Sequence, residues 1–142
     1  MLGTIRALDP EMQKDVHQRI RRTVEAIAQG AGAKADVKID LGYPVTHNHP
    51  GLTRKMLPTL QRVAGEKRVR LVPAITGAED FSFFAQQVPG LFLFLGGTPE
   101  SVPLEKAPAH HTPTFFVDES SLLLGVRTLV HLTVDFLNDP EI

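Results

Sequence analysis

The sequence predicts an α/β fold with a smaller α+β portion at its N-terminal end. Residues 2 to 43 follow the order strand, helix, strand, and the second of these strands alternates apolar and charged residues. Residues 91 to 95 form a continuous apolar run, which is typical of a strand covered on both faces of a sheet. A long amphipathic helix is expected near the C-terminus, so the later part of the chain has the elements of an α/β layer.

The first helix is predicted to begin at Asp9, because its carboxylate can accept from free backbone N–H groups and Pro10 suits the first helical position. Gly30 and Gly32 can adopt the left-handed backbone that ends a helix. The apolar positions of this helix are Met12, Val16, Ile20, Val24, Ile27 and Ala28. A strand with one wet face follows at residues 35 to 41.

The later elements are predicted from the same signals. A helix at residues 52 to 63 contains Pro58, which should kink or shorten it. Strands at 69 to 72 and 90 to 95 flank a short helix at 79 to 88, and the last helix should run from Asp118 to Asn138. Its expected buried stripe is Leu122, Leu123, Val126, Leu129, Val130, Thr133, Val134 and Leu137. Two strands do not make a covered sheet, so this part should be the edge of a larger one.

Composition excludes several classes of protein. The 142 residues carry a formal net charge of -1, which gives no global field for nucleic acid or an anionic membrane. No cysteine is present, so disulfides, thiolate metal sites and thiol nucleophiles are excluded. No apolar run approaches the roughly 20 residues that span a bilayer. Without a secretory signal pattern at the N-terminus, we expect a cytoplasmic protein with no membrane partner.

The six histidines are the first candidates for chemistry, because imidazole is a common metal ligand and a natural acid or base. His17 and His131 fall in helices and are interpreted as surface or packing residues. His47 and His49 could share a metal if their loop is extended, although a solvated turn explains them more simply. The match of this segment to a His-Asn-His nuclease string is too short, and the basic surface for that activity is lacking.

A second pair, His110 and His111, lies in a loop between the apolar run and the last helix, where α/β folds place ligands. Metal ligation there is one hypothesis and an ordinary loop is the other. Glu79 and Asp80 form a further polar cluster, which would also be favourable for the dipole of a helix that begins there.

Five motifs occur in an order and at separations that resemble the C-terminal part of a family of metal-dependent amidohydrolases. The motifs are Gly3-Thr4-Ile5-Arg6 before Asp9-Pro10-Glu11; Gly42-Tyr43-Pro44; Thr46-His47-Asn48-His49-Pro50; Gly77-Ala78-Glu79-Asp80-Phe81; and His111-Thr112-Pro113 with Phe115 and Val117-Asp118-Glu119. The family includes hippurate hydrolase, indole-acetyl-amino-acid hydrolase and N-acyl-amino-acid amidohydrolases, and is related to aminoacylases and zinc carboxypeptidases. The resemblance covers nearly the whole chain.

This resemblance implies a two-domain, zinc-peptidase-like architecture. Residues 1 to 45 resemble the last strand, helix and strand of a lid and dimerisation domain, and residues 46 to 142 resemble the end of the catalytic α/β domain. The intact family binds two divalent metal ions, with zinc, manganese, cobalt or nickel as the expected metal. The implied substrate is a small-molecule N-acyl amino acid or similar amide, and the implied partner is a second copy, in a homodimer or through exposed edges.

Carried over by position, His111 resembles the last metal ligand of the family, and His110 falls where an apolar residue is usual. Asn48 and Arg6 match lid positions on the substrate side, where they could hold a carboxylate or carbonyl oxygen. Glu79 matches the Gly-Glu-Asp motif, in which it would orient neighbouring groups without ligating the metal. His49 stands where relatives often have Asp, so the resemblance gives no support to a metal role for His47 and His49.

The other metal ligands and the glutamate base of the family have no counterpart in these residues. Catalytic metal sites usually have three protein ligands, so the chain by itself should be inactive. The hypothesis is therefore a fragment of a hydrolase that cleaves small amides. The alternatives are a non-catalytic, truncated relative that self-associates or binds another subunit, and a self-contained binding module whose loop histidines hold a metal.

Overall fold

The computed structural model describes all 142 residues and contains only helices, turns and extended segments. The chain forms two compact units. The first unit comprises Met1–Asn48 and Val72–Gly90, and the second comprises His49–Leu71 and Leu91–Ile142. The predicted domains, 1 to 45 and 46 to 142, are a different division, because residues 72 to 90 lie with the N-terminal segment. The domain assignment therefore stays a prediction.

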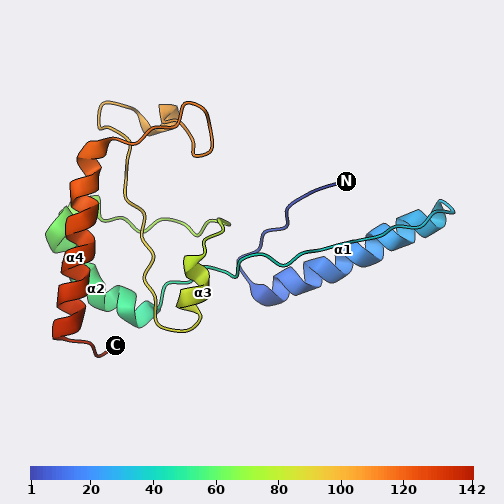
Figure 1. The fold of residues 1–142 in the computed structure, drawn as a ribbon, viewed down its shortest axis with the longest axis horizontal. Helices are drawn as coiled ribbons and strands as arrows, with labels where there is room; N and C mark the ends of the chain where they lie inside the picture. The colour runs from blue at the N-terminus through green and yellow to red at the C-terminus, as the bar shows by residue number, and fades with distance from the viewer. The chain divides into compact units, whose positions relative to one another are not determined.

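Helix α1 spans Pro10–Gly30 in the first unit (Figure 1). The Asp9 carboxylate accepts from the backbone N–H of Met12 at 2.7 Å, as a helix N-cap does. After the helix, Gly32 has φ +67°, the left-handed conformation expected at a helix end. Both predicted boundaries of α1 are confirmed. No residue of α1 is buried, and Met12 and Ile27 are well exposed, so the predicted apolar stripe is only partly covered.

The structure contains no β-strand, so the predicted α/β class is not confirmed. The segment at 35 to 41 keeps its predicted alternation, since Ala35, Val37 and Ile39 are half-buried while the charged residues between them are exposed. The Arg21 guanidinium donates to the carbonyl of Val37 at 2.6 Å and ties this segment to α1. A β-ladder requires a second extended segment at hydrogen-bonding distance, and the segments at 69 to 72 and 90 to 95 have none either.

The first unit also contains α3, which spans Phe81–Ala85 and is shorter than the predicted helix at 79 to 88. Ser82 is fully buried, and its hydroxyl donates to the carbonyl of Glu79. Gly90 approaches α3 closely, because an added Cβ would lie 3.0 Å from the ring of Phe81. The small residues Ser82 and Gly90 therefore allow the chain to pack closely around this short helix.

The second unit is built on α2 and α4, which pack against each other (Figure 1). Helix α2 spans Pro50–Ala64 and continues through Pro58, while α4 spans Leu122–Asn138 and follows a 3₁₀ turn at Glu119–Ser121. Met56 is the one buried hydrophobic residue of the chain. Short 3₁₀ turns also occur at Glu66–Arg68 and Leu104–Lys106.

Polar groups make much of the contact between α2 and α4. The Asp135 carboxylate accepts from the hydroxyl of Thr59 and from the guanidinium of Arg62, each at 2.5 Å. Arg62 also lies 3.5 Å from the His131 ring, which agrees with the interpretation of His131 as a surface or packing residue. Lys55 pairs with Asp139 at 2.5 Å one turn further along. The two helices are therefore antiparallel, because residue numbers rise along α2 as their partners fall along α4.

The stability of this helix pair is expected to fall in acid. The hydrogen bond from Thr59 and the ion pair with Arg62 hold the pKa of Asp135 below its usual range. A lowered folded-state pKa means that the carboxylate stabilises the fold above the unfolded pKa of about 4 and loses this effect as pH falls through the folded pKa. Because the Asp135 side chain is 33% exposed, solvent screens the ion pair and the effect should be modest.

Urea unfolding of the wild type and of Asp135→Asn, measured from neutral pH to below pH 4, checks this expectation. The two free energies of unfolding should differ at neutral pH and converge in acid. Asp36→Asn, at an exposed residue of the first unit, is the control and should stay parallel to the wild type. A gap between wild type and Asp135→Asn that does not narrow in acid would contradict the assignment.

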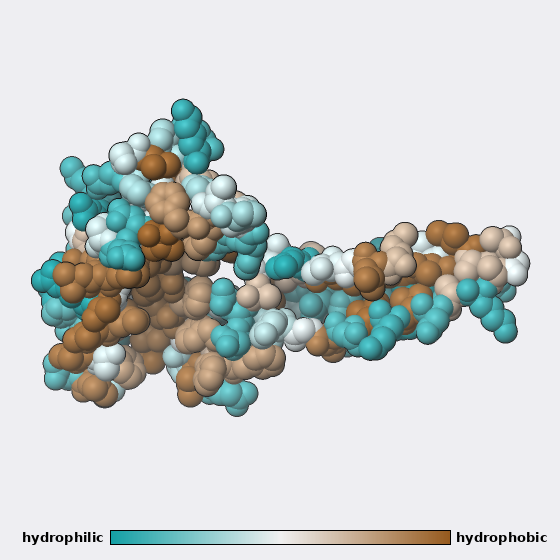
Figure 2. Space-filling model, turned by 45° about the horizontal axis from the view of Figure 1, so that its top comes forward, coloured by the Kyte–Doolittle hydropathy of each residue, from teal (hydrophilic) through white to brown (hydrophobic).

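The predicted buried stripe of α4 is wrong for this structure. Leu123, Leu129 and Leu137 are 64, 62 and 70% exposed, and Thr128 is the buried residue of the helix. The reason is that α2 contacts α4 through polar residues such as Asp135, and no other helix distant in sequence packs on α4. Leu95 approaches α4 at Gly125, but most of the apolar stripe stays exposed. Hydrophobic residues are accordingly widespread on the molecular surface (Figure 2).

One segment, Glu119–Asn138, is long and apolar enough to cross a membrane by length and composition alone. Core helices of soluble proteins pass the same criterion, so this is a weak indication. The expectation of no membrane partner stays a prediction.

Candidate functional site

His111 lies in an exposed loop of the second unit and is the only non-glycine residue with a positive φ, at 62°. Left-handed backbone is uncommon outside glycine, although histidine tolerates it better than most residues. The hydroxyl of Thr112 donates to the carbonyl of Ala109 at 2.8 Å, and the N–H of Phe115 donates to the carbonyl of Thr112 at 3.1 Å. These two bonds close a tight turn that presents the imidazole to solvent.

The fit of this loop to a metal is partial. The His111 ring is accessible and no protein group forms a hydrogen bond with it, so both ring nitrogens are open to a ligand. The chain contains no group of three or more residues that could hold a metal ion. His111 therefore fits as one ligand of a site, and the residues of this chain do not form a complete site by themselves.

Arg6 lies in the first unit, where its guanidinium donates to the carbonyl of Thr76 at 2.7 Å. This bond brings Arg6 to the segment that contains Glu79, three residues further on. A guanidinium has five N–H donors, so further donors of Arg6 remain for an anion. The side chain of Arg6 is exposed, which leaves it accessible from solvent.

Glu79 is half-buried and lies two residues before α3. Its backbone carbonyl accepts from both the N–H and the hydroxyl of Ser82, so the backbone at this position is fixed. Asp80 occupies the N-cap of α3 without a side-chain cap bond. The predicted role of Glu79 in orienting neighbouring groups is not tested by these contacts.

Asn48 is half-buried and is the last residue of the first segment of the first unit, and His49 is the first residue of the second unit. His49 is the N-cap of α2, because its Nδ1 accepts from the N–H of Leu52 at 3.2 Å. A capping role for His49 is missing from the sequence prediction. The signal was present in the Pro50 that follows it, since proline favours the first helical position. An aspartate at this position could make the same bond.

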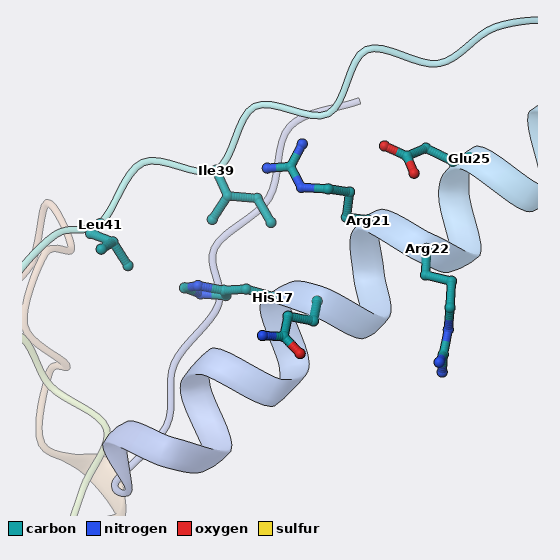
Figure 3. Close-up of a pocket in the computed structure, with 7 residues that line it drawn as sticks. His17, Arg21, Arg22, Glu25, Ile39 and Leu41 are labelled. Atoms are coloured by element: carbon teal, nitrogen blue, oxygen red, sulfur yellow. The ribbon is translucent and has the colours of Figure 1, made fainter.

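The first unit has an open cavity of about 400 Å³ beside α1. His17 and Arg21 reach it from the helix, and Ile39 and Leu41 reach it from the extended segment (Figure 3). His17 therefore lines this open cavity, which agrees with its interpretation as a surface or packing residue. None of the predicted site residues lines this cavity.

Comparison with known proteins places the chain in a family. The profile of Peptidase family M20/M25/M40 matches residues 5–135. Peptidases of this family generally depend on divalent metal ions. No solved structure matches the chain.

Individual relatives include hydrolases of several kinds. Putative amidohydrolase YhaA of Bacillus subtilis is 29% identical over 96% of this chain and 34% of its own length. Thermostable carboxypeptidase 2 of Saccharolobus solfataricus is 34% identical over 97% of this chain and 34% of its own length. N-acetyldiaminopimelate deacetylase of Streptococcus sanguinis is 30% identical over 89% of this chain and 32% of its own length. The chain thus spans about a third of these relatives, and it belongs to Peptidase family M20/M25/M40.

Proposed function

We propose that this chain is part of a metal-dependent amidohydrolase that cleaves the amide bond of N-acyl amino acids or similar small amides. The observation that carries the proposal is the family match over residues 5–135. The names of the amidohydrolase and deacetylase relatives support amide cleavage as the reaction class. In the proposal the architecture is that of an α/β zinc-peptidase-like enzyme, and the extended segments of this chain become strands when further strands pair with them.

His111 is proposed as one ligand of a divalent metal, which when bound would polarise the substrate carbonyl. Its open ring nitrogens and exposed loop support this role. Asn48 and Arg6 are proposed to hold the carboxylate or carbonyl oxygen of the substrate, and the unused N–H donors of Arg6 suit a carboxylate. Glu79 is proposed to orient neighbouring groups. By itself the chain should be inactive, because it does not contain a complete metal site.

A chimera tests the proposal. In Thermostable carboxypeptidase 2, the residues that match this chain are replaced by the chain, giving the carboxypeptidase chimera. We expect the folded chimera to hydrolyse N-acetyl or N-benzoyl amino acids, to lose activity with a chelator and to regain it with zinc, manganese or cobalt. The 142-residue chain assayed alone should show no turnover. A chimera that is folded by circular dichroism but inactive on every such amide would contradict the proposal.

A second candidate function is a non-catalytic chain that associates with copies of itself. The apolar face of α4, with Leu129 at 62% and Val130 at 55% exposed, favours this candidate. It predicts a dimer or larger species by size-exclusion chromatography with light scattering, and dissociation by Leu129→Glu. A folded wild-type monomer over a range of concentrations would count against it.

A further inference from the structure

We propose that His110 is a positioning residue for His111, acting through an aromatic contact with Phe115. The inference rests on the proposed role of His111 as a metal ligand. It concerns His110, which is not itself a proposed ligand. The juxtaposition that carries it is the packing of the His110 and Phe115 rings across the turn that holds His111.

The two rings form a close edge-to-face pair. Their centroids are 4.7 Å apart and their planes meet at 70°. Aromatic rings prefer this arrangement over a face-to-face stack, because the positive edge of one ring meets the negative face of the other. The ring of His110 therefore packs against Phe115. The ring centroids of His110 and His111 are 6.4 Å apart. Neighbouring histidines in one loop therefore have different surroundings.

His111 needs such support because its left-handed backbone is disfavoured for a residue with a Cβ. Two hydrogen bonds contribute, one from the hydroxyl of Thr112 and one from the N–H of Phe115. The bond from Thr112 spans His111, and the bond from Phe115 lies on its C-terminal side. Both bonds are exposed to competing water. The contact between His110 and Phe115 is the one that joins side chains on the two sides of His111, so it restrains the backbone between them.

A fixed backbone at residue 111 has a direct chemical consequence. Metal ligation requires the imidazole to be held in one direction, and groups that orient a ligand commonly change metal affinity by about 10- to 100-fold. An exposed aromatic pair shifts an equilibrium by about 2- to 10-fold. Loss of the His110–Phe115 contact should therefore weaken metal binding within this smaller range.

The test uses nuclear magnetic resonance on the 142-residue chain. The one-bond Cα–Hα coupling of residue 111 reports the sign of φ, since it is smaller for left-handed than for extended or right-handed backbone. We expect the left-handed value in the wild type, a shift away from it in His110→Ala and in Phe115→Ala, and the wild-type value in His110→Phe, which keeps an aromatic ring. The double variant His110→Ala/Phe115→Ala should shift no further than either single variant.

The metal readout uses manganese(II) ions alone, which broaden resonances near the ion. The His111 ring should broaden in the wild type and in His110→Phe, and should need about 2- to 10-fold more manganese in His110→Ala. An unchanged coupling in His110→Ala would overturn the inference. Equal weakening by His110→Phe and His110→Ala would also overturn it, because His110 would then be a ligand itself.

The two proposals can fail separately. If His111→Ala leaves the broadening pattern of the loop unchanged, the metal role of His111 fails. A shifted coupling in His110→Ala would in that case still support the positioning contact. If His111→Ala abolishes the broadening while His110→Ala changes neither readout, the positioning role fails and the metal role is supported.

Discussion

Replacing His111 with Ala is expected to lower the turnover of the carboxypeptidase chimera by at least about 10-fold, because loss of a ligand should cost no less than loss of the groups that orient it. The imidazole lies in an exposed loop with both ring nitrogens open, and alanine offers no donor in its place. The measurement is the steady-state rate on an N-acetyl amino acid at saturating metal.

His17→Ala is the matched control for this variant, because His17 lies on α1 beside the cavity and has no proposed role in the reaction. We expect its rate to stay within about twofold of the unsubstituted chimera, as for a surface substitution of small effect. Turnover of the His111→Ala chimera close to that of the control would count decisively against His111 as a ligand.

The largest effect on stability is expected for Met56→Ala. Met56 lies in α2 and is 4% exposed, so its replacement removes the one buried hydrophobic side chain of the second unit. Substitutions of this kind cost about 2 to 5 kcal/mol, and a small unit that can partly collapse around the cavity should lie near the lower value. Urea unfolding followed by helix content measures the change.

Leu137→Ala is the control for Met56→Ala, since Leu137 lies in the same unit but is 70% exposed. It should change the free energy of unfolding by no more than about 0.5 kcal/mol. Equal destabilisation by the two substitutions would show that Met56 is not buried as described.

Local signals in the sequence predicted the helices well. The Asp9 cap and Gly32 bound α1, and α4 ends at Asn138 as expected. Helix signals are local, because each cap and each turn involves residues only a few positions apart. The helix predicted at 79 to 88 shortens to Phe81–Ala85, and α4 begins at Leu122 after a 3₁₀ turn, four residues later than its predicted start at Asp118.

The strands and the buried faces could not be predicted in the same way, because they depend on neighbours distant in sequence. Residues 91 to 95 are apolar as a covered strand would be, yet nothing in the structure pairs with them. The apolar stripe of α4 is likewise largely exposed, and a polar contact centred on Asp135 takes the place of the expected apolar one. A sequence pattern shows that a face is suited to burial, but the covering element must also be present.

In the candidate site, too, some features could be predicted from the sequence and others could not. The loop position of His111 could be predicted from the sequence, whereas its positive φ and the packing of His110 on Phe115 could not. The N-cap formed by His49 could have been predicted, because Pro50 marks the start of the helix. The roles of Arg6, Asn48 and Glu79 stay predictions, although the bond from Arg6 to Thr76 shows that Arg6 and the Glu79 segment lie in one unit.

Binding of a divalent metal by the His111 imidazole is measured most directly by equilibrium dialysis of zinc against the carboxypeptidase chimera and its His111→Ala variant. We expect the variant to bind zinc at least about 10-fold more weakly at one of the sites, because a ligand should contribute no less than the groups that orient it. Equal zinc affinity and stoichiometry in the two folded proteins would contradict the assignment of this chain's histidine to the metal site.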